Sequence, residues 1–451
     1  MGYLLYNILL WLASPFIILT LLAKPRCRRG LAQRLGRVPK HLRDLGAPIM
    51  WVHAVSLGEV TAAVPLVKSL HQQYPNYVFI VSTVTETGRE AVEQRLAGVA
   101  HHAYGPLDFP WAVNAYVRHL GPVAYLFVET ELWPNLLRTM FRRQIPAIMV
   151  NGRLSTDSFE HYRYVKKFME QVLSCITLFL MQSERDAKRI RELGAKAESV
   201  HVTGNMKFDL CGPEQTDYPL PALRDQLGLQ EHERLFIAGS THPEEEDQLL
   251  RCYKRVCKTI PSLVLLIAPR HIERISEVEA TVLRHGFPCL RKSQLADKSQ
   301  ESFPSKAPRV ILLDTRGELA SLYASGWVAF VGGTLVPVGG HNLLEPAQLG
   351  IPVLYGPYTD HCAESAKILR EAGGGIEIHD EEELAATLIE AYHVTAWCAT
   401  VGQAARQAVE MHRGVVQKNL ALLGSRISSP TTESAEVSSR VSSSQSNVIV
   451  S

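Results

Sequence analysis

The chain has 451 residues, 46% of them hydrophobic, and a formal net charge of +2. This length exceeds what one hydrophobic core usually supports, and the near-neutral charge argues against nucleic-acid binding, which needs many clustered cations. The eight cysteines show no zinc-ligand spacing, so the composition predicts two domains in a reducing compartment, without a structural metal.

The first predicted element is an uncharged segment from Met1 to Ala23, long enough for a spanning helix of roughly 20 residues. It lacks the basic start of a cleaved secretory signal, and basic residues follow it, so we expect a membrane anchor over residues 1–23. The positive-inside rule then places the rest of the chain on the cytoplasmic side. Pro15 leaves open both a spanning helix and a helix that lies in the membrane surface.

A basic stretch follows the anchor and precedes the first acid, Asp44. Such a stretch suits anionic lipid headgroups, although it can equally act as a topology determinant alone. Its members are Lys24, Arg26, Arg28, Arg29, Arg34, Arg37, Lys40 and Arg43.

Short apolar runs alternate with amphipathic stretches from residue 24 to residue 210, a pattern typical of buried parallel strands joined by crossover helices. We expect one doubly wound, Rossmann-like domain there. Its predicted strands span residues 49–54, 77–82, 123–128, 145–150 and 176–181.

The run Ser56-Leu57-Gly58-Glu59 follows the first predicted strand, where Gly58 permits a tight turn and Glu59 opens the next helix. A carboxylate in this place can take a proton from an acceptor hydroxyl, and the helix N-terminus favours its ionised form. Helix capping would explain a Glu at this position equally well. Glu59 is therefore a candidate general base.

Two acids, Glu129 and Glu131, follow the strand at 123–128. Carboxylates two residues apart are rarely needed for packing, and Glu129, directly at the strand end, is the stronger candidate to point into a ligand site. Lys207 lies near the end of this domain, where a cation can stabilise a leaving phosphate or bind a carboxylate. An ordinary solvated lysine is the alternative interpretation of Lys207.

Residues 211–233 hold three prolines and two glycines and break the alternation, so we expect a linker there. A second Rossmann-like domain is predicted over residues 234–424, and a serine-rich, disordered tail over residues 425–451. The two domains would bind their ligands at strand ends along one interdomain cleft. The strands predicted for the second domain span residues 235–238, 263–268, 310–313, 328–331 and 351–354.

Two loops at strand ends of the second domain carry side chains suited to ligand binding. Pro269-Arg270-His271 follows one strand, and Arg270 can fork onto a phosphate or a carboxylate. Arg316-Gly317-Glu318 follows the next strand, and its backbone can read a base edge. A hydrogen-bonded structural histidine is the commoner case for His271 and His341, so neither is assigned a role.

The segment from Phe330 to Ala347 combines an apolar strand, a four-glycine loop and a helix start. Glycines permit close approach of a ligand, and the amides of a helix's first turn favour negative charge, so the segment predicts a phosphate site. Glu345 is placed to accept hydrogen bonds from a ribose diol. A tight strand-to-helix turn is the alternative explanation.

Six ordered motifs resemble those of one family, the 3-deoxy-D-manno-octulosonic acid (Kdo) transferases of lipopolysaccharide assembly, and the likeness covers nearly the whole chain. The resemblance implies an α/β protein with the GT-B fold, two Rossmann-like domains facing an interdomain cleft, behind an N-terminal membrane-anchor helix. The motifs are Ser56-Leu57-Gly58-Glu59, Glu129-Thr130-Glu131-Leu132-Trp133-Pro134-Asn135, Gly204-Asn205-Met206-Lys207-Phe208-Asp209, Pro269-Arg270-His271, Gly317-Glu318-Leu319 and Gly339-Gly340-His341-Asn342-Leu343-Leu344-Glu345.

The resemblance also implies a reaction: inverting transfer of Kdo from CMP-Kdo to a lipid A precursor, without a metal or other cofactor, at the cytoplasmic face of the inner membrane. Glu59 would be the general base, and Glu129 and Lys207 would stabilise the transition state. Arg316 and the serine-rich tail depart from the family pattern. The CMP-binding residues would be Pro269, Arg270, Arg316, Gly317, Glu318, Asn342, Leu343, Leu344 and Glu345.

Two other classes of function stay open from the residues alone. Another nucleotide-sugar transferase or a sugar-nucleotide epimerase would share the glycine loop of the second domain, but not the acids of the tethered first domain. A non-catalytic membrane-anchored scaffold would have no reason to place acids and glycines at successive strand ends, and it would not turn over CMP-Kdo.

Overall fold

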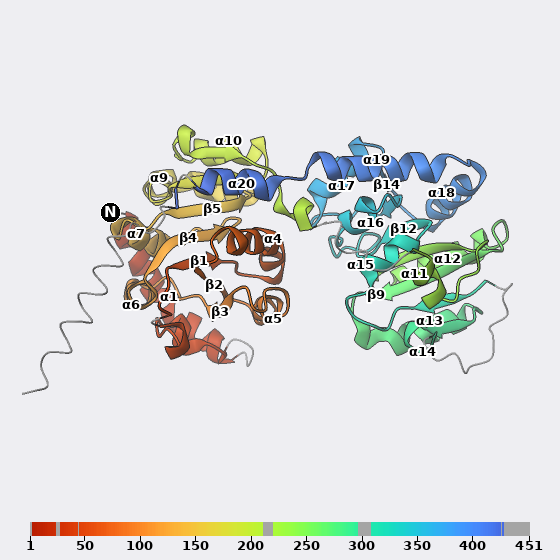
Figure 1. Cartoon of the computed structure of the whole chain (residues 1–451), viewed down its shortest axis with the longest axis horizontal. Coiled ribbons are helices and arrows are strands. Elements are labelled where there is room, and N and C mark those ends of the chain that lie inside the picture. Colours follow the sequence, from red (N-terminus) through yellow and green to blue (C-terminus); the bar gives the residue numbers. More distant parts are fainter. Residues whose placement is uncertain are drawn as a thin grey trace, which may run out of the picture. The chain divides into compact units, whose positions relative to one another are not determined.

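The computed structural model describes residues 2–23, 28–43, 45–210, 220–295, 308–424 and 426–427. It divides into two compact units (Figure 1): unit 1 holds Met1–Leu210 and Gly414–Ser451, and unit 2 holds Cys211–Arg413. The first part of the expected linker, up to residue 219, and the tail beyond residue 427 lie outside the described residues.

Unit 1 is built on a parallel seven-stranded sheet of strand order β3-β2-β1-β4-β5-β6-β7. The five predicted strands are confirmed, with ends that differ by at most two residues. Two further strands, β3 and β7, form the two edges of the sheet. The strands are β1 (Ile49–His53), β2 (Val78–Thr83), β3 (His101–Tyr104), β4 (Pro122–Val128), β5 (Ala147–Gly152), β6 (Leu178–Met181) and β7 (Val200–Val202).

Both faces of this sheet are covered by helices, which explains why its central strands are apolar throughout. In β1, Met50 and Val52 belong to one buried cluster and Ile49 and Trp51 to another, as alternating side chains on a strand must. The helices of unit 1 are α1 (Gly2–Ala23), α3 (Leu31–Arg34), α4 (Leu57–Gln73), α5 (Glu86–Arg95), α6 (Pro110–Leu120), α7 (Pro134–Arg142), α8 (Thr156–Tyr164), α9 (Lys166–Leu173), α10 (Glu184–Glu192) and α20 (Val415–Gly424), with the 3-10 turns η1 (Lys40–Leu42), η2 (Ala197–Ser199) and η3 (Met206–Leu210).

The C-terminal helix α20 belongs to unit 1, so the second domain does not run to residue 424 as expected. Val415, Leu420 and Leu423 are buried in the same cluster as the apolar face of α4. Asp209 fixes the start of α20, because its carboxylate accepts hydrogen bonds from Gly414 N at 2.8 Å and Val416 N at 2.6 Å. Asp209, at the end of the first segment of unit 1, thus caps the helix that begins where the chain re-enters unit 1.

The basic stretch after α1 is only partly available to a membrane. Arg28, Arg37 and Lys40 are exposed. Arg34, in contrast, is buried and donates a hydrogen bond to the carbonyl of Val84. Its guanidinium therefore holds the fold together, and its expected contact with lipid headgroups is wrong.

Unit 2 contains a second parallel sheet, with strand order β10-β11-β9-β8-β12-β13-β14. All five strands predicted here are present, and the edge strands β10 and β14 are additional. The strands are β8 (Arg234–Thr241), β9 (Leu263–Pro269), β10 (Cys289–Arg291), β11 (Val310–Leu312), β12 (Val328–Val331), β13 (Val353–Tyr355) and β14 (Gly375–Glu377).

Helices cover this sheet as well. The second half of the expected linker contains a helix, α11, and Leu223 on this helix is buried in the core of unit 2. The helices are α11 (Leu220–Gln226), α12 (Glu245–Val256), α13 (Ile275–Arg284), α14 (Lys292–Leu295), α15 (Leu319–Leu322), α16 (Leu344–Gln348), α17 (Ala363–Glu371), α18 (Glu381–His393) and α19 (Trp397–Met411), with the 3-10 turns η5 (Ile272–Arg274) and η6 (Tyr323–Ser325).

Each sheet has a point at which the strand order reverses, and in such sheets ligands bind outside the carboxyl ends of the strands at that point. In unit 1 the point lies between β1 and β4, and in unit 2 it lies between β8 and β12. The loops that follow these four strands are therefore the first places to look for chemistry.

We expect Asp209→Ala to loosen α20, because it removes both hydrogen bonds at the start of the helix. Loss of a helix N-cap destabilises a protein by about 1 kcal/mol, and up to about 2 kcal/mol in strong cases. Denaturant unfolding should show this decrease, and hydrogen exchange should increase in α20 before it does in α4. The exposed Asp225 on α11 offers a matched control, since Asp225→Ala should leave both measurements unchanged; equal effects of the two variants would contradict the capping role.

Candidate active site

Glu59 lies in the first turn of α4, as predicted. It follows β1 at the point where the strand order reverses, and we call the position outside the carboxyl ends of β1 and β4 the crevice of unit 1. Its carboxylate turns back toward the chain that enters the helix: Val55 N donates to Oε2 and Ser56 Oγ donates to Oε1, both at 2.9 Å. Glu59 is 8% exposed. It therefore caps the helix and still keeps a small accessible area, so the two roles weighed for it are compatible.

Glu129 directly follows β4 on the other side of the same crevice. Its φ of 57° is left-handed, a conformation that non-glycine residues rarely adopt. Glu129 N donates to the carbonyl of Val150 on β5 at 3.0 Å, which holds this turn against the sheet. Backbone strain of this kind is common at functional sites, where the surrounding structure enforces it.

The acids at this crevice influence one another's charge. Burial raises the pKa of Glu59 to about 7; hydrogen bonds at the helix entry oppose the rise, whereas Glu131 and Glu129 add to it. Burial also raises the pKa of Glu131, although Trp133 Nε1 donates a hydrogen bond to its carboxylate at 2.8 Å. A carboxyl group with a pKa near neutrality can both accept and release a proton at physiological pH.

Lys207 lies on η3, a segment that packs against α4. Buried amides hold this segment in place: Asn151 Oδ1 accepts from Met206 N at 2.9 Å, and Asn205 Oδ1 accepts from Lys207 N at 3.0 Å. Gln182 links the two amides, since it donates to the carbonyl of Asn151 and accepts from Asn205. The position of the Lys207 backbone relative to the helix of Glu59 is thus fixed by a polar network.

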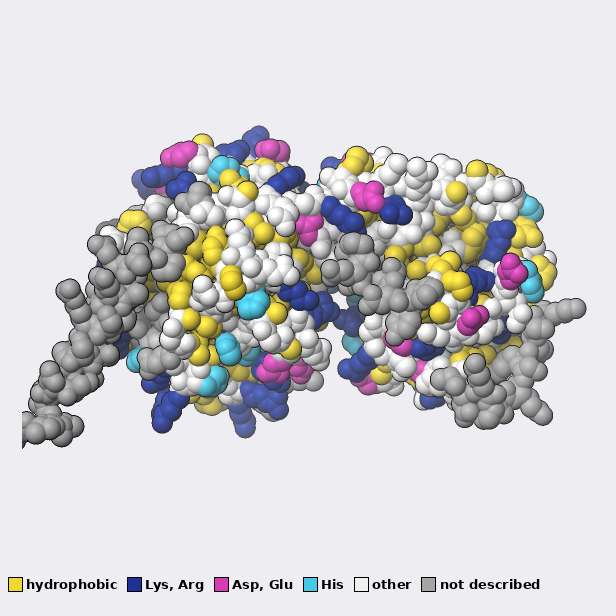
Figure 2. Space-filling model, viewed as in Figure 1, with side chains coloured by type: hydrophobic (Ala, Val, Ile, Leu, Met, Phe, Trp, Pro, Cys, Tyr) yellow, Lys and Arg dark blue, Asp and Glu magenta, His cyan; other side chains and the backbone are white. Residues whose placement is uncertain are grey.

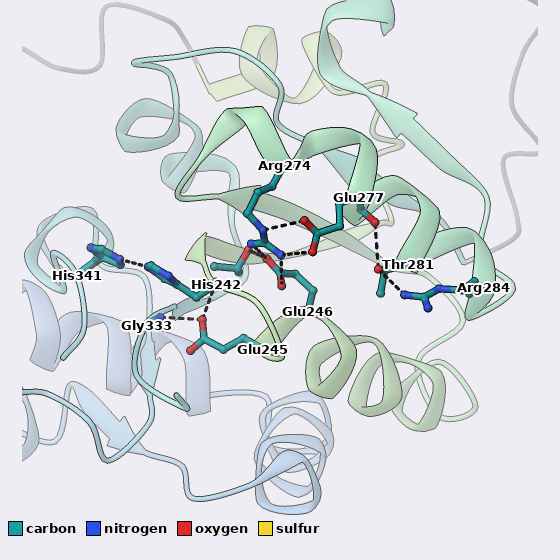
Figure 3. A network of polar contacts seen from close by, with 10 residues as sticks. His242, Glu245, Glu246, Arg274, Glu277, Thr281, Arg284, Gly333 and His341 are labelled. Carbon is teal, nitrogen blue, oxygen red and sulfur yellow. Dashed lines mark hydrogen bonds and ion pairs between the residues drawn. The ribbon is translucent and has the colours of Figure 1, made fainter. Parts of the chain in front are cut away.

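In unit 2, a buried carboxylate that the sequence analysis missed occupies the start of the glycine loop (Figure 3). Glu245 opens α12 and is fully buried. Its Oε2 accepts from Gly333 N at 2.7 Å and His242 N at 2.9 Å, and its Oε1 accepts from Thr334 N and Leu335 N, both at 3.0 Å. The protein's own acid therefore fills the amides at the start of the loop, whereas the helix-start amides on which the phosphate prediction rests lie further along the segment.

The second half of the glycine loop is shaped differently. Gly339 has a φ of 102°, and a Cβ there would lie 2.8 Å from the ring of His361, so a side chain does not fit. Further along, Asn342 orders the start of α16, accepting from Leu344 N and donating to Glu345 Oε1, both at 3.1 Å. This part of the loop remains the candidate for anion binding.

Three histidines and Arg270 lie near one another beside the glycine loop. His341 Nε2 lies 2.8 Å from His242 Nε2, and the two rings stack (Figure 3). Burial lowers the pKa of His341 to about 4, and Arg270, His361 and His271 lower it further. Burial also lowers the pKa of His242. Both rings therefore favour the neutral form, in which one donates to the other, and the nearby charge comes from Arg270. No local pattern assigns His341 a role, because its partner His242 follows a different strand.

The loop after β11 is held mainly by its acid. Glu318 accepts hydrogen bonds from Lys292 Nζ at 2.5 Å and from the Thr315 hydroxyl. The side chain of Arg316 is 76% exposed and pairs with Glu273 at 2.8 Å. Gly317 has a φ of 84°. The Arg316 guanidinium is therefore directed to Glu273 on the surface, and Gly317 shapes the turn of the loop.

The predicted residues of unit 2 come to one edge of the sheet. β9 pairs with β8 and with β11, and β12 pairs with β8, all in parallel, so their following loops emerge together. Pro269 closes β9, and Glu345 lies near enough to raise the pKa of Tyr323.

Within the described part of the chain, no group of three or more His, Cys, Asp or Glu is placed to hold a metal ion.

Residues 29–210 match the family model of 3-deoxy-D-manno-octulosonic-acid transferase (kdotransferase). The chain is 33% identical over 427 residues to the 3-deoxy-D-manno-octulosonic acid transferase of Haemophilus influenzae, covering 93% of this chain and 97% of that protein. It is 32% identical over 343 residues to the 3-deoxy-D-manno-octulosonic acid transferase of Aquifex aeolicus, covering 76% and 85%.

Among solved structures, UDP-GlcNAc 2-epimerase from Neisseria meningitidis bound to UDP-GlcNAc aligns with a TM-score of 0.56 over 82% of this chain and 100% of that chain. At 12% identity this likeness shows the fold alone. Together with the two parallel sheets it confirms the expected GT-B fold.

The electrostatic coupling at the crevice of unit 1 gives a direct test. Glu131→Gln should lower the pKa of Glu59, since it removes a neighbouring negative charge, and Glu129→Gln should lower it by less. Carbon-13 titration of glutamate-labelled protein can follow the carboxyl signal, which Glu59→Gln would identify by its loss. Glu198→Gln, at an exposed position, is the control and should leave the pKa of Glu59 unchanged. If Glu131→Gln also leaves that pKa unchanged, the coupling is contradicted.

Proposed function

The chain belongs to the family of Kdo transferases, and from that membership we propose that it transfers Kdo from CMP-Kdo to a lipid A precursor, with inversion at the anomeric carbon. That it is a glycosyltransferase follows from the family; the acceptor, the stereochemistry and the residue roles are the proposal. The observation that carries it is the buried Glu59 with a pKa of about 7, beside Glu129 and Glu131 at the crevice of unit 1.

In the proposed reaction, Glu59 acts as the general base. An acceptor hydroxyl attacks the anomeric carbon of Kdo, its proton passes to Glu59, and the bond from that carbon to the phosphate oxygen of CMP breaks as CMP leaves. A base needs to be ionised when the acceptor arrives and to hold the proton afterwards, and a pKa near neutrality suits both steps.

Glu129 and Lys207 are proposed to stabilise the transition state. The sugar develops positive charge as CMP departs, so a fixed carboxylate such as Glu129 favours it, while a cation such as Lys207 favours the departing phosphate or the Kdo carboxylate. The strained turn at Glu129 and the amide network around Lys207 support this, because both limit how far these backbones can move.

The nucleotide is proposed to bind at the sheet edge of unit 2. Arg270 would hold the phosphate, Glu345 the ribose diol, and the backbone around Gly317 the base. Phosphate contact is assigned to the loop from Gly339 onward, since Glu245 occupies the amides before it. The remaining contacts in this proposal come from Pro269, Arg316, Glu318, Asn342, Leu343 and Leu344.

We also propose that α1 attaches the enzyme to the cytoplasmic face of the inner membrane. Among the described residues α1 is the one helix that is long and apolar enough to cross a membrane. Its most apolar window has a mean hydropathy of 2.0, and none of the residues in that window is fully buried. An acylated acceptor resides in the bilayer, and its phosphates would favour the exposed basic residues after α1. No metal is assigned to the reaction, which is expected to proceed in the presence of EDTA.

The decisive assay supplies CMP-Kdo and a lipid A precursor and measures CMP release and product mass. Glu59→Gln should lower turnover at least ~100-fold, the lower end for loss of a general base, while CMP affinity and the melting transition stay unchanged. In the wild type, kcat/KM should rise as the pH increases through about 7, because Glu59 must be ionised to accept the proton. Glu198→Gln is the matched control, and full activity of Glu59→Gln would overturn the assignment.

For the nucleotide site, Arg270→Ala and Glu345→Ala should each weaken CMP binding by about 1 to 3 kcal/mol, the range for a lost hydrogen bond to a charged group. Calorimetry with CMP measures this without the acceptor. Arg406→Ala, at an exposed position on α19, should leave binding unaltered. If both site variants bind CMP as the wild type does, the nucleotide site lies elsewhere.

A further inference from the structure

α1 has two unlike sides, and the polar side faces unit 1. Its partly buried positions recur every three or four residues, the spacing of one helix face. Every hydroxyl- or amide-bearing side chain of α1 lies on this face. Its members are Gly2, Tyr3, Tyr6, Asn7, Leu10, Ser14, Ile17, Thr20 and Leu21.

The start of α1 is bound to unit 1 by specific contacts. Tyr6 Oη donates to Asp108 Oδ2 at 2.9 Å. Asn7 exchanges amide hydrogen bonds with Asn135, at 2.7 and 3.3 Å. The ring of Phe168 on α9 contacts Tyr3 edge-on, with centroids 5.3 Å apart. In Figure 1 the N-terminus accordingly lies beside α7, the helix that begins next to Asn135.

These partners are rigid parts of the domain. Asp108 is buried and accepts hydrogen bonds from Asn135 N at 2.9 Å and Leu136 N at 2.8 Å, so it caps α7. Burial raises the pKa of Asp108 to about 7. The contact site of α1 is therefore formed by the helix that immediately follows the loop of Glu129 and Glu131.

After α1 the chain contacts the body of unit 1 again from Gly30 onward. Arg28 donates to the carbonyl of Leu22 at the end of the helix. Shortly afterwards, Gly30 packs against Tyr104, and Arg34 is buried. A helix of 22 residues is about 33 Å long, close to the thickness of a hydrocarbon core. A spanning helix would carry its first turn to the far side of that core, whereas here the first turns contact the same body that the chain meets again at Gly30.

From this geometry we propose that α1 lies in the plane of the membrane, inserted into one leaflet, with its polar face on unit 1 and its apolar face in lipid. Outside the face on unit 1, α1 carries ten exposed large apolar side chains, of which Trp11, at the edge, also contacts Phe109 with ring centroids 5.5 Å apart. The ten are Leu4, Leu5, Ile8, Leu9, Trp11, Leu12, Phe16, Ile18, Leu19 and Leu22. An apolar face of this length suits acyl chains at the headgroup boundary.

Charge complementarity favours a lipid surface as the occupant. Arg28, Arg37 and Lys40 are exposed on the segment that follows α1. Figure 2 shows Lys and Arg side chains gathered along the lower edge of unit 1. Anionic headgroups attract such residues next to an inserted apolar helix. The inference rests on the proposed membrane attachment and adds the orientation of α1 in the membrane. In this orientation one helix, α7, separates the Glu129 loop from α1 and its leaflet.

The test is the side of the membrane on which the N-terminus lies. A recognition site for a specific protease, added before Met1 of the full chain, should be cut in inverted inner-membrane vesicles and protected in intact spheroplasts. A second chain with the site after Ser451 marks the cytoplasmic side in the same preparations. Cutting of the N-terminal site only in spheroplasts would mean that α1 spans, and would overturn the in-plane arrangement while leaving attachment intact. Recovery of the chain in the soluble fraction would overturn both.

A lysine scan of the outward face gives an independent measurement. Leu5, Leu12 and Leu19 are spaced by two helical turns and are 58, 73 and 65% exposed. In-plane insertion places all three at similar depth, so Leu5→Lys, Leu12→Lys and Leu19→Lys should each lower co-sedimentation with phosphatidylethanolamine–phosphatidylglycerol vesicles by at least about tenfold, and by similar factors. A spanning helix would place Leu12 at the bilayer centre. A much larger loss for Leu12→Lys than for the other two would therefore overturn the proposal, as would dimers that form in detergent and bind no vesicles.

Discussion

Backbone N–H groups left without partners where strands end and helices begin are the constraint on which the rest of this structure depends. At three of these places a carboxylate supplies the acceptor: the buried Glu245 takes four such groups, and the buried Asp108 and the partly buried Asp209 take two each. Unpaired polar groups and unpaired charges are both unfavourable in a protein interior, and pairing them satisfies both. The loops with the candidate site residues are therefore held in place before any ligand binds.

Glu59 uses the same physics for a different result. It accepts one backbone N–H and one hydroxyl, keeps a small exposed area, and faces the negative charges of Glu131 and Glu129. Desolvation and like charge then bring its pKa to about 7. Glu245, enclosed by four donors, is a structural acid, whereas Glu59 can exchange a proton with a bound hydroxyl. The accessible area and the neighbouring acids, more than burial alone, distinguish the two.

The N-terminal helix shows why average hydropathy is an incomplete description. Its polar side chains are few, so the mean over the segment indicates a membrane span. Their position matters more than their number: Tyr3, Tyr6 and Asn7 lie on one face and find partners on unit 1. A soluble amphipathic helix turns its apolar face to the protein, and α1 turns that face away. Its contacts with α7 also link the proposed membrane contact to the loop of the candidate catalytic acids.

The sequence by itself determined the fold class and the central strands, because a strand buried on both faces must be apolar along its length. It also located Glu59 and Glu129, since a strand end followed by an acid is a local pattern. The missed strands β3, β7, β10 and β14 are all sheet edges, paired on one side only and therefore free of that requirement. Only the tertiary structure decided that Glu245 would fill the glycine loop, that His242 would meet His341, and that α20 would return to unit 1. These outcomes depend on which distant segments reach the same sheet edge, and no local pattern of residues specifies its own partner.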